Sequence, residues 1–157
     1  MNDYTISSSA LIQAPAALVY AILVDYHDAH PRILPNPPFV GLEVERGGTG
    51  TGTIFLLRMK AMGRTQTLRG TVTEPEPGRT VVETYDSGIV TTFVVEPRDE
   101  GRSCSVTITT VPSVRTGVAG AIARWLTTQL LRPALTRELA NVAAAVEQLY
   151  RQTRSKH

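Results

Sequence analysis

The sequence predicts an α+β protein in which seven antiparallel strands form one sheet that curls around a long C-terminal helix. Three observations lead to this fold class. An N-terminal strand precedes two short helical segments, six further strand-like segments recur at roughly ten-residue spacing, and an amphipathic helix follows them. A single antiparallel sheet must bury one face, and only the last helix is long enough to cover it.

The N-terminal elements follow from alternation and from the placement of prolines. Tyr4–Gln13 alternates apolar residues with serines, as a strand does. Pro15 suits the first position of a helix, which we expect over Ala16–Val24. A second short helical segment over Asp25–Ala29 is expected to end before Pro31, because proline disfavours helical backbone in the residue before it.

From Phe39 onward the apolar residues recur with a period of two. The expected strands are 39–44, 53–59, 66–72, 80–85, 89–96 and 103–111. Gly- and Pro-containing turns separate them, including the glycine-rich run at 47–52 and Pro75–Gly78. Strands in this order with short connections are typical of an antiparallel meander.

The C-terminal segment over Thr116–Tyr150 predicts one long helix. Its apolar stripe consists of Ile122, Leu126, Leu130, Leu131, Leu135, Leu139, Val142, Val146 and Leu149. Such a helix is about 52 Å long, whereas a domain of this size has a radius of gyration of about 15 Å. The helix must therefore cross the domain, overhang it or bend, and Pro133 is the expected place for a bend. Residues 1–150 are expected to form a single domain, and 151–157 a basic, disordered tail.

Composition excludes several classes of protein. The formal net charge is +2, but Arg151, Arg154 and Lys156 supply that excess, and without them the chain is at −1. This balance argues against nucleic acid as a partner, which needs clustered positive charge. The single cysteine, Cys104, excludes an internal disulfide. We find no secretory signal and no apolar run that could span a membrane, so a cytoplasmic location is expected by elimination.

A set of short motifs indicates a family. They are Ala14-Pro15, Val24-Asp25-Tyr26, His30-Pro31, Leu34-Pro35, the glycine-rich turn at 47–52, Val72-Thr73-Glu74-Pro75, and Thr92–Pro97 ahead of Gly101. With them the chain resembles the START-like (helix-grip, SRPBCC) superfamily, and within it the small proteins of polyketide cyclase/dehydrase type. The resemblance covers residues 4–150 and departs at Ile33 or Leu34, where family members often carry Trp. It implies a helix-grip fold with a ligand cavity between sheet and helix, in proteins as different as lipid carriers and cyclases.

Alternation and helical spacing select the residues that would line this cavity. Phe55 and Leu57 share one face of their strand, and Trp125 and Gln129 lie four apart on the long helix. The full set of candidate ligand-binding residues is Tyr26, His30, Phe55, Leu57, Tyr85, Phe93, Trp125 and Gln129. Glu83 shares a face with Tyr85, and we expect it to point to solvent, because charged residues are rarely buried without a partner.

Other patterns are better explained without special chemistry. His27 and His30 are the only cluster that resembles a metal site, and a zinc site needs at least three protein ligands. We therefore expect no metal and no cofactor. Gly48-x-Gly50-x-Gly52 precedes a strand rather than a helix, which indicates a hairpin turn and not a phosphate-binding loop. Cys104 is expected to be a small buried hydrophobic residue.

Three hypotheses for function remain. The first is binding of a hydrophobic small molecule or lipid in the cavity, with transport of that molecule as an option. The second is a polyketide cyclase-like enzyme that uses general acid–base catalysis, with His30, Tyr85 and Glu83 as the candidate groups. The third is an interaction role, in which the Ala/Leu-rich helix joins a partner or forms a homodimer. Binding is favoured, because no two titratable groups stand out as an acid–base pair.

Overall fold

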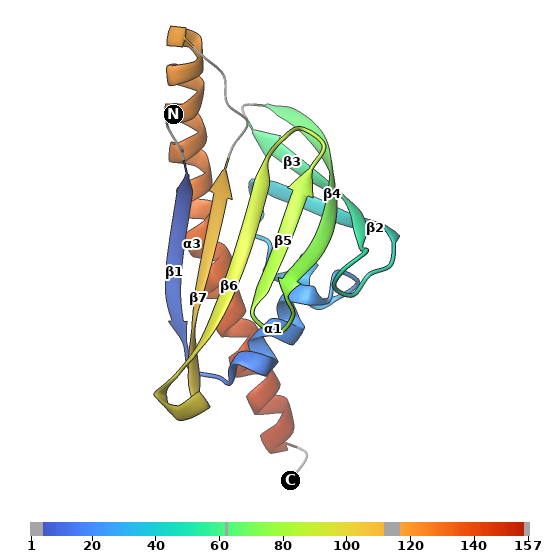
Figure 1. Ribbon diagram of the computed structural model, residues 1–157, viewed down its shortest axis with the longest axis vertical. Helices are drawn as coiled ribbons and strands as arrows, with labels where there is room; N and C mark the ends of the chain where they lie inside the picture. The colour runs from blue at the N-terminus through green and yellow to red at the C-terminus, as the bar shows by residue number, and fades with distance from the viewer. Residues whose placement is uncertain (1–4, 62, 112–116, 156–157) are drawn as a thin grey trace.

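The computed structural model describes residues 5–61, 63–111 and 117–155, and within the last helix it describes side chains for 129 and 131–152. The elements in chain order are β1 (Ile6–Ile12), α1 (Ala16–Val24), α2 (Ala29–Ile33), β2 (Phe39–Arg46), β3 (Ile54–Ala61), β4 (Arg64–Glu76), β5 (Thr80–Tyr85), β6 (Val90–Arg98), the 3-10 turn η1 (Asp99–Gly101), β7 (Ser103–Val111) and α3 (Gly117–Ser155). Figure 1 shows one sheet with α3 behind it.

The strands form one seven-stranded antiparallel sheet in the order β1-β7-β6-β5-β4-β3-β2. Consecutive strands from β2 to β7 are neighbours, and β1 pairs with β7 at the far edge, with Ala10 opposite Val106. The expected meander and the fold class are therefore confirmed. The glycine-rich run at 47–52 lies between β2 and β3, which pair antiparallel.

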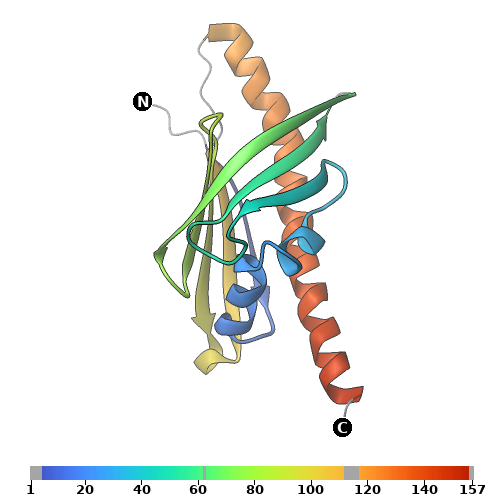
Figure 2. The same ribbon diagram turned by 90° about the vertical axis from the view of Figure 1, so that its right-hand side faces the viewer.

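The sheet curls around α3, and α1 and α2 lie at one end between the sheet and the helix (Figure 2). The face of α3 that meets the sheet is a stripe of buried side chains with helical spacing: Leu131, Ala134, Leu135, Glu138, Leu139, Val142 and Val146. Apolar side chains from alternate positions of the strands cover the other side of this core. No helix in the described part of the chain is both long and apolar enough to cross a membrane.

Two element boundaries near prolines differ from the sequence-based expectation. Helix α2 begins at Ala29 instead of ending there, which puts Pro31 in its first turn, where a missing N–H costs no helical hydrogen bond. Strand β4 continues through Pro75 to Glu76, and its pairing with β5 shifts register between Thr73 and Glu76, at the irregularity where proline is tolerated.

The C-terminal helix is longer than expected. Helix α3 runs as one element through Pro133, which lies on its exposed side, and overhangs the sheet at both ends (Figures 1 and 2). On that side water can hydrogen-bond to the carbonyl that Pro133 leaves without a donor. The helix also continues beyond Tyr150 to Ser155, so the segment expected to be a disordered tail is helical through 155, since its Gln and Arg residues favour helix.

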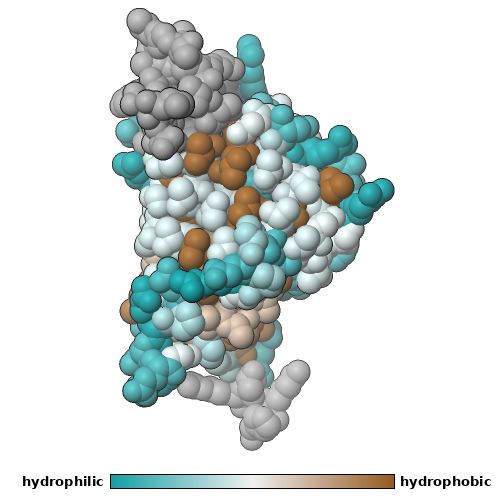
Figure 3. Space-filling view, in the orientation of Figure 1, coloured by the Kyte–Doolittle hydropathy of each residue, from teal (hydrophilic) through white to brown (hydrophobic). Residues whose placement is uncertain are grey.

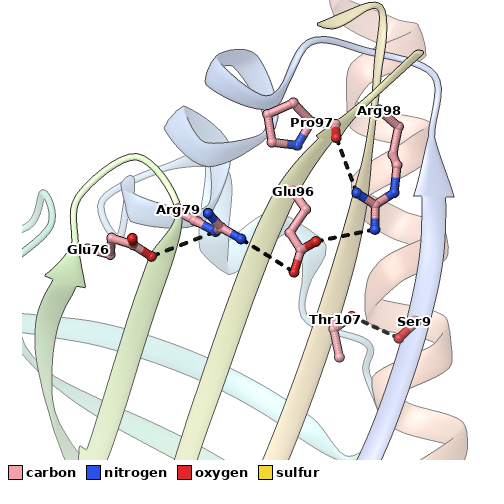
Figure 4. A network of polar contacts seen from close by, with 7 residues as sticks. All are labelled: Ser9, Glu76, Arg79, Glu96, Pro97, Arg98 and Thr107. Carbon is pink, nitrogen blue, oxygen red and sulfur yellow. Dashed lines mark hydrogen bonds and ion pairs between the residues drawn. The ribbon is translucent and has the colours of Figure 1, made fainter. Parts of the chain in front are cut away.

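The outer face of the sheet, turned away from α3, is mainly hydrophilic with scattered hydrophobic residues (Figure 3). At one end Arg79 contacts Glu76 at 3.7 Å and Glu96 at 3.8 Å, and Arg98 contacts the same Glu96 at 3.2 Å (Figure 4). Ser9 and Thr107 are hydrogen-bonded across the β1–β7 pair at 2.9 Å. These exposed contacts are typical of a solvated sheet surface and contribute little stability.

Candidate functional site

A cavity lies between the inner face of the sheet and α3. Its volume is about 60 Å³, which is room for a few water molecules. Aromatic and aliphatic side chains supply most of its lining: Leu34, Phe39, Leu42, Phe55, Leu57, Met59, Leu68, Tyr85, Ile89, Phe93, Leu131 and Leu135. The polar lining residues are His30, Glu83, Thr91, Thr110 and Glu138, of which the two threonines are hydrogen-bonded to each other at 3.0 Å.

Glu83 is the polar centre of this site, and our expectation that it faces solvent is wrong. Its side chain lies on the inner face of β5 together with Val81 and Tyr85, and only 4% of the residue is exposed. The Tyr26 hydroxyl donates a hydrogen bond of 2.7 Å to Oε2, and the Tyr85 hydroxyl donates one of 2.9 Å to Oε1. Two donors, one on each oxygen, satisfy the acceptors of the carboxyl group and explain why Glu83 tolerates burial.

The two tyrosines are held by the surrounding structure. The Tyr26 backbone N–H donates to the Gly48 carbonyl at 2.8 Å, so the glycine-rich turn fixes the residue that follows α1. Its ring stacks on Phe55, with centroids 5.1 Å apart. Burial, followed by the nearby charge of Glu83, raises the pKa of both Tyr26 and Tyr85 well above the usual value for tyrosine. Both phenols therefore remain protonated donors at neutral pH.

His30 is the third group around Glu83. It is buried, and its Nδ1 is 2.7 Å from the Leu23 carbonyl, which can only accept, so Nδ1 carries a proton. Its Nε2 then points toward Glu83 Oε2 at 3.6 Å. The ring stacks on Tyr26, with centroids 4.4 Å apart, and meets Phe93 edge-on. This arrangement leaves Nε2 as the atom of His30 that faces Glu83 and the cavity.

Glu138 reaches the cavity from the opposite side, on α3. Only 3% of the residue is exposed, and its Oε2 is buried with no hydrogen-bonding partner among the described residues. Burial, and then the charge of Glu83, raises the pKa of this carboxyl well above the usual range. The neutral acid is consequently the favoured form of Glu138.

Most of the residues selected from the sequence meet at this cavity. His30, Phe55, Leu57, Tyr85 and Phe93 line it, and Tyr26 lies directly behind them with its hydroxyl on Glu83.

Of the two candidates on the long helix, Gln129 does not line the cavity. Gln129 is exposed and lines a separate surface depression together with Arg132, because it lies outside the buried stripe of α3. The side chain of Trp125 lies outside the described residues.

Glu138 was missed by the sequence-based reasoning. The signal that could have found it is its position: it follows Leu135 by three residues and precedes Val142 by four, inside the apolar stripe. A charged residue at such a position is a strong indication of a functional group or of a buried partner.

The remaining candidates are accounted for by local contacts. His27 is exposed, with its Nε2 3.0 Å from the Gly47 carbonyl, and so is separated from the buried His30. No three His, Cys, Asp or Glu side chains within the described ranges are grouped so that they could hold a metal ion. Cys104 is buried in β7, and burial raises the pKa of its thiol.

The fold is shared with solved structures. The KanY protein (ms6282), known from an NMR solution structure, is 29% identical with a TM-score of 0.82, over 94% of this chain and 99% of that one. A START superfamily protein from Mycobacterium smegmatis is 18% identical with a TM-score of 0.71, over 92% of this chain and 98% of that one. The Zhui aromatase/cyclase from Streptomyces sp. R1128 is 17% identical with a TM-score of 0.71, over 92% and 94%. The last two similarities show the fold.

A family model agrees with these structural similarities. It describes polyketide cyclases/dehydrases and lipid transport proteins and matches residues 4–147, which is nearly the whole chain. Comparison with curated proteins gives no match. With its helix-grip fold, its apolar cavity and this match, the chain belongs to the polyketide cyclase/dehydrase and lipid transport family.

Proposed function

We propose that the protein binds a mainly apolar small molecule in the cavity between the sheet and α3. The observation that carries this proposal is the lining itself, in which aromatic and aliphatic side chains surround a small group of buried polar atoms. Ligand sites commonly combine these two features, since apolar contact supplies affinity and a few polar groups fix orientation. Burial of 200 Å² of apolar ligand surface would contribute roughly 5 kcal/mol.

A sizeable ligand needs the cavity to expand. The volume of about 60 Å³ is well below the 300 Å³ or more of typical small-molecule sites, at roughly one fifth. The lining residues that are only half-buried are Leu34, Leu42, Met59 and Ile89, and they lie on the Pro-rich loop, β2, β3 and the β5–β6 turn. We expect the ligand to enter there, because these side chains have the fewest contacts to lose, and Met59 can adopt many shapes.

Native mass spectrometry of freshly purified protein, before and after extraction with organic solvent, tests this proposal. Met59→Trp fills the cavity mouth, whereas Arg58→Trp adds the same side chain on the exposed face of β3 and serves as the control. We expect a co-purifying apolar mass, or uptake of the neutral dye Nile red, in the wild type and the control but not in Met59→Trp. Equal uptake by both variants, or no uptake by the wild type, would contradict the proposal.

A second candidate function is general acid–base catalysis on a poly-keto chain. The observation that favours it is the pairing of Glu83, whose two oxygens accept hydrogen bonds, with Glu138, whose burial favours the neutral acid. A buried carboxyl group with a raised pKa can protonate a leaving oxygen, and a second carboxyl group in the same cavity can accept a proton from carbon. The sequence indicated no acid–base pair, and Glu138 supplies the second buried carboxyl group that was missing there.

Turnover separates this candidate from simple binding. Incubation with a short poly-keto thioester would give a product lighter by one water if cyclisation and dehydration occur. The Glu83→Gln variant should then lose turnover by at least about a hundredfold and still take up Nile red. An unchanged substrate mass in the wild type would eliminate the enzyme reading and leave binding.

A further inference from the structure

The charged groups around the cavity are all of one kind, apart from His30. Glu83 and Glu138 both line it, and none of the described lining residues is Lys or Arg. Among the lining side chains that the structure describes, His30 is the only one that can carry a positive charge, and its Nε2 already faces Glu83 at 3.6 Å. A negatively charged ligand group would therefore leave water for an apolar cavity in which no described side chain offers it a free cation.

The electrostatic effect of Glu83 on Glu138 indicates the repulsion that a negatively charged ligand group would experience in this cavity. The charge of Glu83 raises the pKa of Glu138, so the two carboxyl groups are close enough to disfavour a second negative charge in this space. A ligand carboxylate beside them would be subject to the same repulsion, in addition to the cost of leaving water.

Glu138 also offers an unused hydrogen-bonding atom. Its Oε2 is buried, belongs to a residue that lines the cavity, and has no partner among the described residues. Leaving such an atom unpaired is costly, and a ligand hydroxyl or carbonyl would satisfy it. Glu83 cannot serve in the same way as readily, because both of its oxygens already accept from tyrosines.

Given the proposed binding function, we infer that the cavity selects uncharged apolar molecules that carry a hydroxyl or carbonyl oxygen, held by Glu138, and rejects fatty-acid-like anions. The ligand's polar end then lies at α3 beside Glu138, and its apolar part lies against Phe55, Leu57 and Phe93 of the sheet. This assigns Glu138 as the residue that determines specificity.

Displacement of Nile red at about pH 8 by two ligands of equal chain length tests the inference, because carboxylic acids are ionised there. The ligands are 1-octanol and octanoate. We expect 1-octanol to bind the wild type more tightly than octanoate by at least about tenfold. Octanoate binding as tightly as 1-octanol would overturn the inference and leave the proposed function standing. Failure of Nile red and both ligands to bind would overturn the proposed function together with the inference.

Two variants test the role of Glu138 itself. Glu138→Gln keeps a hydrogen-bonding group of the same shape and should retain 1-octanol binding. Glu138→Leu removes it and should weaken 1-octanol by about tenfold, whereas n-octane, which has no polar group to meet Glu138, should bind as it does to the wild type. Because Leu also removes a buried unpaired polar group, its melting temperature should equal or exceed that of the wild type, which excludes misfolding as the cause. Unchanged 1-octanol binding in Glu138→Leu would overturn the assignment.

Discussion

Gly70 is a strand residue whose backbone lies close to an aromatic side chain of the cavity. It pairs with Phe55 in the β3–β4 register, and a Cβ built on it would lie 2.6 Å from Phe55 Cζ, 2.9 Å from Cε1 and 3.1 Å from Cε2. The Phe55 ring is fully buried, stacked on Tyr26 at 5.1 Å and edge-on to Tyr85 at 5.7 Å. We therefore predict that Gly70→Ala displaces Phe55 and destabilises the protein.

The magnitude follows from these distances. Ordinary contacts of a Cβ begin near 3.4 Å, so the ring must retreat by about 0.8 Å into side chains that are themselves packed. Overpacking of this kind costs about 1–3 kcal/mol. Replacing Gly by Ala returns about 0.4–1 kcal/mol, because it restricts the unfolded chain. The expected net loss in the free energy of unfolding is about 1–2 kcal/mol, and each kcal/mol lowers the melting temperature of a domain of this size by about 2–4 °C.

Urea unfolding of two glycine variants isolates the steric effect. Gly41 is also a strand glycine, in β2, and a Cβ there would meet nothing within 4 Å, so Gly41→Ala is the matched control. The cost of Gly70→Ala should also shrink in a Phe55→Leu background, where the smaller side chain makes room. The reasoning is refuted if Gly70→Ala is as stable as Gly41→Ala, or if its cost is the same with Leu at position 55.

Three further predictions concern buried hydroxyl and thiol groups. Tyr26→Phe removes a donor from the buried Glu83 carboxylate and should cost about 2 kcal/mol in urea unfolding, whereas a cost near zero would mean that the hydrogen bond contributes nothing. Burial, followed by the hydrogen bond to Glu74, raises the pKa of Tyr20 from 10.0 to about 12. The advantage of wild type over Tyr20→Phe should therefore be complete below pH 10 and decline as the pH rises through about 12, as measured by unfolding at each pH; a constant difference would contradict it. The Cys104 thiol is fully buried, with its pKa raised by burial, and should react with a thiol reagent at least about a hundredfold more slowly in the folded protein than in urea; equal rates would show that β7 opens readily.

The fold could be predicted from the sequence because its elements obey simple periodic rules. Strand alternation and the turns between strands identify the meander, and the length of the last helix leaves one way to cover the sheet. The boundaries were less accurate where one residue type has two local roles. Pro31 can end a helix or lie in its first turn, and the contacts of Asp25 with the backbone N–H groups of residues 28 and 29 decide for the latter.

The candidate site was predicted only in its apolar part. Phe55, Leu57 and Phe93 follow from alternation, because a buried face and an apolar face coincide. For Glu83 the same alternation was available, but the general rule that charged residues stay exposed was given more weight. That rule has an exception when partners are present, and the partner Tyr26 lies 57 residues away in sequence. Which side chains meet across the fold depends on how strongly the sheet curls around α3, and periodicity does not specify that curvature.

Glu83, which sequence reasoning placed in solvent, and Glu138, which it missed, are both carboxyl groups buried in the core. Apolar residues at positions 83 and 138 would extend the core without the cost of burying carboxyl groups. Glu83 recovers part of that cost through Tyr26 and Tyr85, but the buried Oε2 of Glu138 recovers nothing from the described residues. A group that costs stability and lies against a cavity is explained more readily by what enters the cavity than by the fold. Unfolding of Glu138→Leu would measure the stability that the buried carboxyl group costs. Binding of 1-octanol by the same variant would measure the affinity that this group contributes.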